Sequence, residues 1–135
     1  MKLLDTTFLA HYYRGNSRVE SFLDTHESTD EDLVTTTINV EEIAVGVHAV
    51  EDDPTEADVR SDLGWLTVLP FETGDAFAAA AIEARLLADE TVDADRINAL
   101  AGEILIAGAA DHHDATVVTE NVADFEQLGV AVEGY

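Results

Sequence analysis

Four acidic residues lie at the junctions of an alternating strand and helix pattern, and their types and positions could build a metal site. They are Asp5, Glu42, Glu103 and Asp124. Asp5 directly follows a short apolar run, and in open parallel sheets ligands bind beyond the carboxyl ends of the strands, where the strand order reverses. Asp124 follows a later apolar run after a short turn. The sequence therefore predicts that the four carboxylates can meet at one edge of a sheet.

The chemistry of such a cluster is that of a hard divalent cation. Clustered carboxylates repel one another and raise each other's pKa, and a bound cation reverses this effect because it favours the ionised forms. Ligation by oxygen alone, without histidine or cysteine, points to Mg²⁺ or Mn²⁺. One such ion can generate hydroxide while another stabilises the leaving oxygen. The predicted reaction is in-line hydrolysis of a phosphodiester.

Three of the acids also have simpler structural interpretations. Asp5 could cap a helix that is expected to begin at Thr7, and Asp124 could cap a terminal turn. Glu42 could be the capping-box partner of Asn39, which lies three residues before it. Each of these acids alone is therefore compatible with a role in helix capping.

Glu103 is the strongest sequence evidence for a metal site, because it is expected in the middle of the most apolar helix. A buried charge needs a partner, since desolvation costs several kcal/mol or forces protonation. The chain has six lysine and arginine residues against 29 acids, so a salt bridge is a less economical answer than a metal ion or a water-filled site.

A second group of polar residues is predicted to support the site. Thr7 and Thr119 could donate hydrogen bonds to a carboxylate or to metal-bound water, or could be ordinary helix-cap and strand-end residues. Arg14 and Arg18, near the helix after Asp5, are candidate phosphate contacts, or else surface ion-pair partners of the abundant acids. The five histidines show no metal-ligand spacing such as HExxH and are interpreted as solvent-exposed or helix-end residues.

Five short apolar runs are predicted as strands that position these residues. They lack strict alternation, which is typical of a parallel sheet covered on both faces. The runs are Lys2 to Leu4, Leu33 to Thr35, Trp65 to Leu69, Ala115 to Thr119 and Val130 to Val132. Strands that alternate with helices predict a small three-layer α/β sandwich with a central parallel sheet.

The helices between the strands are predicted from apolar stripes at helical spacing. The stripes are Val19-Phe22-Leu23, Val40-Ile43-Ala44-Val47, Phe77-Ala81-Ala84, and one helix apolar nearly all round from Ile97 to Ala107. Thr73 or Asp95 could cap the later helices.

Length and composition predict one domain over residues 1–135. The longest apolar run, Ala76 to Ile82, is far shorter than the ~20 residues that span a bilayer, so no membrane segment is expected. No secretory signal precedes the first strand. The absence of cysteine excludes disulfides and thiolate ligands. We expect a soluble cytoplasmic protein.

The net charge of −23 is unusually negative for a chain of this length, and Lys2 is the only lysine. Disorder is one interpretation of such charge, but the aliphatic content and the regular periodicity argue against it. Mimicry of a nucleic acid is another. Adaptation to a salty cytosol, where an acidic and lysine-poor surface stays hydrated, is the interpretation favoured here. A halophilic archaeon is the expected source.

Four segments together resemble the PIN-domain ribonucleases, and most closely the VapC-type toxins of type II toxin–antitoxin pairs. Leu3 to Leu9 is similar to the family's opening, in which an aspartate ends the first strand and Ser or Thr follows two residues later. Thr37 to Gly46 resembles the segment that carries a glutamate, with Glu42 aligned. Glu103 to Gly108 is similar to the Asp-x-x-Ile-Ala-Ala helix, and Thr119 to Phe125 to the Thr-x-Asn-x-x-Asp-Phe block.

The resemblance implies a PIN-like fold and a metal-dependent endoribonuclease that uses Mg²⁺ or Mn²⁺. The four acids would then be the catalytic and metal-binding residues, with Asn121 beside the two threonines in support. The implied partners are an RNA substrate, a small antitoxin whose tail occupies the groove, and a second copy of the chain. Two positions depart from the family: Glu103 replaces an aspartate, and Glu120 stands where arginine is frequent.

Two functions of other classes remain open from the residues. A PIN-like fold with weakened metal affinity at Glu103 could act only by binding a protein partner. A phosphoryl-accepting receiver domain would also place an aspartate at a strand end. That class requires a paired acid cluster near the N-terminus and a lysine on a late strand, and the sequence has neither.

Overall fold

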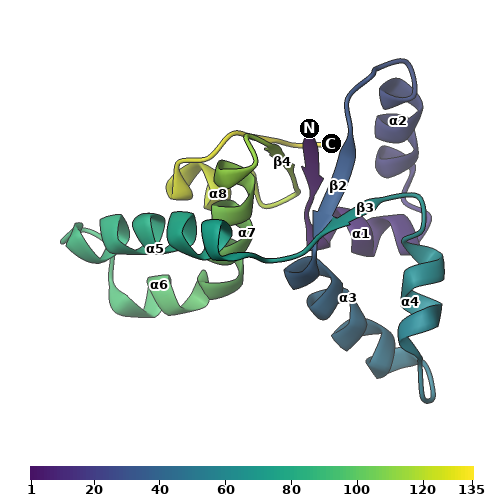
Figure 1. Ribbon diagram of the computed structural model, residues 1–135, viewed down its shortest axis with the longest axis horizontal. Helices are drawn as coiled ribbons and strands as arrows, with labels where there is room; N and C mark the ends of the chain where they lie inside the picture. The colour runs from purple at the N-terminus through teal and green to yellow at the C-terminus, as the bar shows by residue number, and fades with distance from the viewer.

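In a computed structural model, which describes residues 1–135, five parallel strands form one sheet in the order β3-β2-β1-β4-β5. Helices α1 to α4 lie on one side of this sheet and α5 to α8 on the other (Figure 1). The strands are β1 (Lys2–Leu4), β2 (Leu33–Thr36), β3 (Thr67–Leu69), β4 (Thr116–Val118) and β5 (Val132–Glu133). The predicted α/β sandwich and its five parallel strands are confirmed, with strand ends that differ by at most two residues.

The helices complete a three-layer arrangement. Their bounds are α1 (Thr6–Tyr13), α2 (Ser17–His26), α3 (Thr37–Val50), α4 (Glu56–Asp62), α5 (Thr73–Ala88), α6 (Ala94–Ala99), α7 (Ala101–His112) and α8 (Val122–Leu128). None of them combines the length and the hydropathy needed to cross a bilayer.

The strand order reverses between β1 and β4. The chain builds outward from β1 through β2 to β3 and then returns to place β4 on the other side of β1. The last residue pair of the β1–β4 ladder is Leu4 with Val118, so Asp5 and Thr119 leave the sheet next to each other. Ligands of open parallel sheets bind at such a reversal, beyond the carboxyl ends of the strands.

One apolar core covers each face of the sheet, because successive strand residues point to opposite sides. Leu3 and Val117 belong to the core under α5 to α8. Leu4 and Val118 belong to the core under α1 to α4. All four side chains are fully buried, which explains why the strand sequences are continuously apolar and do not alternate.

The apolar segment predicted as one helix from Ile97 to Ala107 is two helices. Helix α6 ends at Ala99, and Leu100 (φ −91°, ψ 10°) is both the C-cap of α6 and the N-cap of α7. Glu103 therefore lies in the first turn of α7, and its side chain is half-buried. The prediction that it sits mid-helix in an apolar environment was wrong, because the apolar pattern continues across the break at Leu100.

Helix α5 buries a different stripe from the predicted one. Phe77 is 81% exposed, and the buried face carries Asp75, Ala79, Ile82 and Leu86. The helix is apolar on every side, so its spacing alone does not identify the face that packs.

Helix caps also differ from the sequence predictions. The capping box of α3 joins Thr36 and Asn39, so Glu42 is free of that role. Helix α6 is capped by Asp93 rather than Asp95. At the start of α5 the main-chain N–H of Glu72 donates to Asp75 Oδ2 at 2.7 Å.

Asp75 stays ionised although its side chain is fully buried. Burial raises its pKa, but hydrogen bonds from the Glu72 N–H and the His112 ring outweigh that effect, and the pKa lies below the usual range.

The contact of α5 with α7 gives a stability prediction. An ideal Cβ at Gly108 would lie 2.6 Å from both Cβ and N of Ala79, so G108A forces the two helices apart. We expect a loss of roughly 1–3 kcal/mol, the usual cost of overpacking. The measurement is urea unfolding in molar salt.

Gly46, in α3, provides the matched control because nothing lies within 4 Å of its ideal Cβ. G46A gains the same helix propensity, worth about 1 kcal/mol, without a clash. Equal unfolding free energies for G46A and G108A would contradict the close α5–α7 contact.

Candidate active site

The Asp5 carboxylate lies at the reversal of the strand order and is almost completely buried, with 4% of its surface exposed. The main chain of Asp5 caps α1, but its side chain makes no capping hydrogen bond. Instead, Oδ2 accepts from the hydroxyl of Thr119 at 2.7 Å and from that of Thr7 at 3.1 Å. The two predicted threonines therefore hold Asp5 from β4 and from α1.

Asn39 is a third residue whose side chain contacts Asp5, and it is not among the predicted site residues. The buried Asn39 donates from Nδ2 to Asp5 Oδ1 at 3.4 Å and to Thr6 Oγ1 at 3.1 Å. Its own Oδ1 accepts from the hydroxyl of Thr36, so the capping box also aims the amide at Asp5. The spacing of Asn39 and Glu42, one helical turn apart, could have indicated that both face the site, but it predicts a capping box equally well.

Glu42 lies in the second turn of α3 and faces the same edge. Burial raises the pKa of Glu42, and the charges of Asp5, Glu103 and Glu41 add to the rise, while a hydrogen bond from the Thr6 hydroxyl opposes it. The structure thus brings the Glu42 carboxyl group within range of repulsion by Asp5 and by Glu103.

Gly102 makes room for this arrangement at the start of α7. An ideal Cβ at Gly102 would lie 3.0 Å from Glu42 Oε1, so a side chain there would press on the carboxylate. Helix α3 packs against both α1 and α7, which explains how acids so far apart in sequence reach one place.

Asp124 lies apart from these contacts. Its Oδ1 accepts from Arg96 Nη2 at 2.6 Å, and the same guanidinium binds the side chain of Gln127. Asn121, which precedes α8, donates its main-chain N–H to Thr119 Oγ1 at 3.0 Å. Asp124 is therefore already neutralised by a cation from α6.

The predicted RNA contacts differ in their surroundings. Arg18 forms an ion pair with Glu120 at 2.7 Å and lies 5.5 Å from the centre of the Tyr135 ring. Arg14 ends α1, is exposed, and forms no ion pair. Only Arg14 is therefore free of a competing acid.

No lysine or arginine forms an ion pair with Asp5, Glu42 or Glu103. Three carboxylates of one edge thus lack a counter-charge in the protein, although ions buried without a partner are costly. The donors are carboxylate and hydroxyl oxygens, which is the set that Mg²⁺ and Mn²⁺ prefer. The chemistry of these residues fits a hard divalent cation, but their carboxylate oxygens do not all lie within 4.8 Å of one another.

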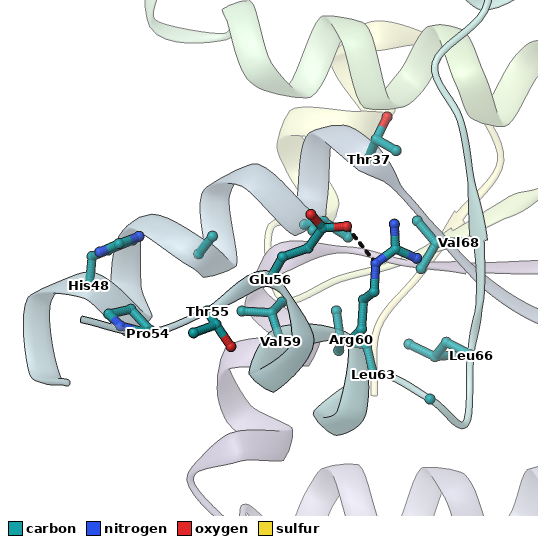
Figure 2. Close-up of a pocket in the computed structure, with 13 residues that line it drawn as sticks. Thr37, His48, Pro54, Thr55, Glu56, Val59, Arg60, Leu63, Leu66 and Val68 are labelled. Carbon is teal, nitrogen blue, oxygen red and sulfur yellow. Dashed lines mark hydrogen bonds and ion pairs between the residues drawn. The ribbon is translucent and has the colours of Figure 1, made fainter. Parts of the chain in front are cut away.

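A separate apolar cavity of about 670 Å³ lies between α3 and α4 (Figure 2). Apolar side chains line much of it, among them Val40, Val59, Leu63 and Leu66. At its rim Arg60 donates to Glu56 at 2.7 Å. None of the four predicted acids lines this cavity.

Comparison with known proteins places the chain in a family. The family model described as the PIN domain matches residues 2–130. The chain is a PIN domain. None of the curated proteins matches it in sequence.

Solved structures similar to this PIN domain include toxin–antitoxin proteins. FitAB bound to an IR36 DNA fragment is 27% identical, with a TM-score of 0.75, and the alignment covers 99% of this chain and 94% of that one. FitAcB from Neisseria gonorrhoeae is 29% identical, with a TM-score of 0.71 and coverage of 98% and 96%. VapBC2 from Rickettsia felis, bound to a promoter DNA fragment, is 17% identical and shares the fold, with a TM-score of 0.77 and coverage of 99% and 98%.

The raised pKa of Glu42 predicts a pH-dependent stability for the metal-free PIN domain. A carboxyl group whose folded-state pKa is raised destabilises the fold once ionised, above its folded pKa, and costs nothing below its unfolded pKa of about 4.3. E42Q should therefore raise the melting temperature at pH 8 in EDTA. The gain should disappear as the pH falls below about 4.

The control is E83Q, at an exposed glutamate of α5. It should change the melting temperature little at either pH. A wild-type-like melting temperature for E42Q at pH 8 would contradict the repulsion among the three acids.

Proposed function

We propose that this PIN domain is a metal-dependent endoribonuclease and the toxin of a toxin–antitoxin pair. The observation that carries the proposal is the group of three carboxylates at the strand-order reversal, which has no cationic side chain to neutralise it. Membership of the PIN family and similarity to the FitAB and VapBC structures support a toxin nuclease.

Asp5, Glu42 and Glu103 would hold the Mg²⁺ or Mn²⁺ ion. A bound ion of this kind lowers the pKa of water and stabilises charge on a phosphoryl oxygen. The protein orients the ligands. Thr119 and Thr7 fix Oδ2 of Asp5, and Asn39 fixes Oδ1. Such support around a ligand is worth 10–100-fold in affinity or activity.

Asp124 is the weakest member of the proposed set. Its Oδ1 is bound to Arg96, so a role in metal binding requires its other oxygen or an intervening water. We therefore expect Asp124 to contribute less than the three acids around Asp5.

RNA is the proposed substrate in spite of the net charge of −23. In ~1 M salt the Debye length is about 3 Å, so repulsion of the phosphates is largely screened. The same salt removes the benefit of counterion release. Binding would depend on the metal ion and on local contacts, of which Arg14 is the least encumbered and Arg18 must first leave Glu120.

The test is cleavage of a structured RNA by the purified protein in molar salt with Mn²⁺ or Mg²⁺. D5N should lower the rate by at least about 10²-fold, the scale of losing one strong transition-state contact. T119V should lower it about 10- to 100-fold, because Asp5 loses its shortest hydrogen bond. D124N should have a smaller effect than D5N.

The control is E126Q on α8, whose side chain is exposed, and it should cleave like the wild type. Cleavage that persists in EDTA or in D5N would overturn the metal mechanism. If the wild type neither cleaves RNA nor binds Mn²⁺ in calorimetry, the alternative of a non-catalytic binding module replaces the proposal.

The proposed partner is an antitoxin, because the chain is similar in fold to VapBC2 and to a member of the VapBC family of toxin–antitoxin systems from Mycobacterium tuberculosis. The cavity between α3 and α4 is our candidate for the groove that receives it, since apolar side chains such as Val59, Leu63 and Leu66 line much of it (Figure 2). This groove adjoins α3, the helix that carries Glu42. Homodimerisation and adaptation to high salt stay predictions.

The partner proposal is tested by A44R, which places a long charged side chain in the groove. Binding of the antitoxin encoded by the adjoining gene should weaken at least about tenfold, equivalent to about 1.4 kcal/mol. The control is A84R, at an exposed alanine of α5. Equal antitoxin affinities of the two variants would place the antitoxin elsewhere, and RNA cleavage by A44R would report that it is folded.

A further inference from the structure

A second group of metal-ligating side chains lies where the start of α5 meets the end of α7. It consists of Asp75, His112 and His113. His112 Nδ1 is 2.7 Å from Asp75 Oδ1, and His113 Nε2 is 3.2 Å from the same oxygen. All three ligand atoms lie within 4.8 Å of one another. No sequence pattern predicts this group, because Asp75 is far from the histidines in the chain.

This group is separate from the acidic site at the strand-order reversal. Glu103 is in the first turn of α7 and His112 is its last residue. With a rise of about 1.5 Å per residue, these two positions are about 13 Å apart along the helix. The donors also differ, since two are imidazole nitrogens.

His113 contains an unsatisfied atom that faces Asp75. Its Nε2 is buried and has no hydrogen-bond partner, although Asp75 Oδ1 is close. An unpaired buried polar atom costs roughly 1–3 kcal/mol. A cation between His113 and Asp75 would remove that cost.

The other two ligands are held in place. Asp75 Oδ2 accepts from the main-chain N–H of Glu72 at 2.7 Å, which leaves Oδ1 for the histidines. The His112 ring lies against Gly74, where an ideal Cβ would be only 2.3 Å from Cε1, so glycine makes room for the ring. The His112 side chain is 41% exposed, and it gives the group access to solvent.

We propose that Asp75, His112 and His113 form a binding site for a borderline transition metal of the Zn²⁺ type. Two imidazoles and one carboxylate are a donor set that Zn²⁺ accepts, with a further position open to water. Ligand atoms bound tetrahedrally to such an ion at about 2.1 Å lie about 3.4 Å apart. The 3.2 Å between His113 Nε2 and Asp75 Oδ1 is close to that spacing, and the 2.7 Å between His112 Nδ1 and Asp75 Oδ1 would have to widen when the ion binds. The ion would join α5 to α7 and stabilise their packing.

A metal-free clamp, in which a histidinium pairs with Asp75, would use the same side chains and predicts no metal binding. Calorimetry separates the two, with Zn²⁺ alone titrated into the EDTA-treated full chain in molar salt. We expect one Zn²⁺ per chain in the D5N variant, which disables the acidic site, and a higher melting temperature with the ion. H112Q and H113Q should each bind at least about tenfold more weakly.

H48Q is the matched control, because His48 is an exposed histidine on α3, and it should bind like the wild type. Co²⁺ as a second probe should give visible absorption that H113Q loses while its circular dichroism stays native. Absence of Zn²⁺ binding, or equal binding by H112Q, H113Q and H48Q, would overturn the site. RNA cleavage does not enter this test, so the two proposals fail independently.

Discussion

The hydrogen bond from Thr119 to Asp5 is the contact on which the site depends, because it crosses the point where the strand order reverses. It can form only if β4 pairs with β1 on the side opposite β2. Once it forms, a buried carboxylate lies at the edge where α3 and α7 also begin. The desolvation of that charge is opposed by the hydroxyl groups of Thr119 and Thr7 and by the amide of Asn39.

The few cationic side chains of the protein leave the group of acids around Asp5 without a counter-charge. Lys2 pairs with Glu133, Arg18 with Glu120, and Arg96 with Asp124, all outside the group around Asp5. A cationic side chain among Asp5, Glu42 and Glu103 would neutralise them and compete with a divalent ion. The shortage of cationic side chains in the whole protein is thus also found at the proposed active site.

Helix α7 links the two candidate metal sites and sets their different chemistry. Its first turn contributes Glu103 beside Glu42, and its last residues contribute imidazoles beside Asp75. Close contact at Gly108 with Ala79 fixes α7 against α5, and so fixes the histidines relative to the carboxylate. The packing of one helix pair therefore determines the geometry of the second site, while the sheet determines that of the first.

The strands, the α/β class and the candidate acids could be predicted from the sequence, because apolar runs and strand-end carboxylates are local patterns. Three features required the folded chain: Asn39 donates to Asp5, Arg96 pairs with Asp124, and Glu103 is half-buried near a helix start. The tertiary structure also decided which face α5 buries and that Asp75 meets two histidines. These outcomes depend on which elements pack together, and that is set by long-range contacts between side chains that no local spacing encodes.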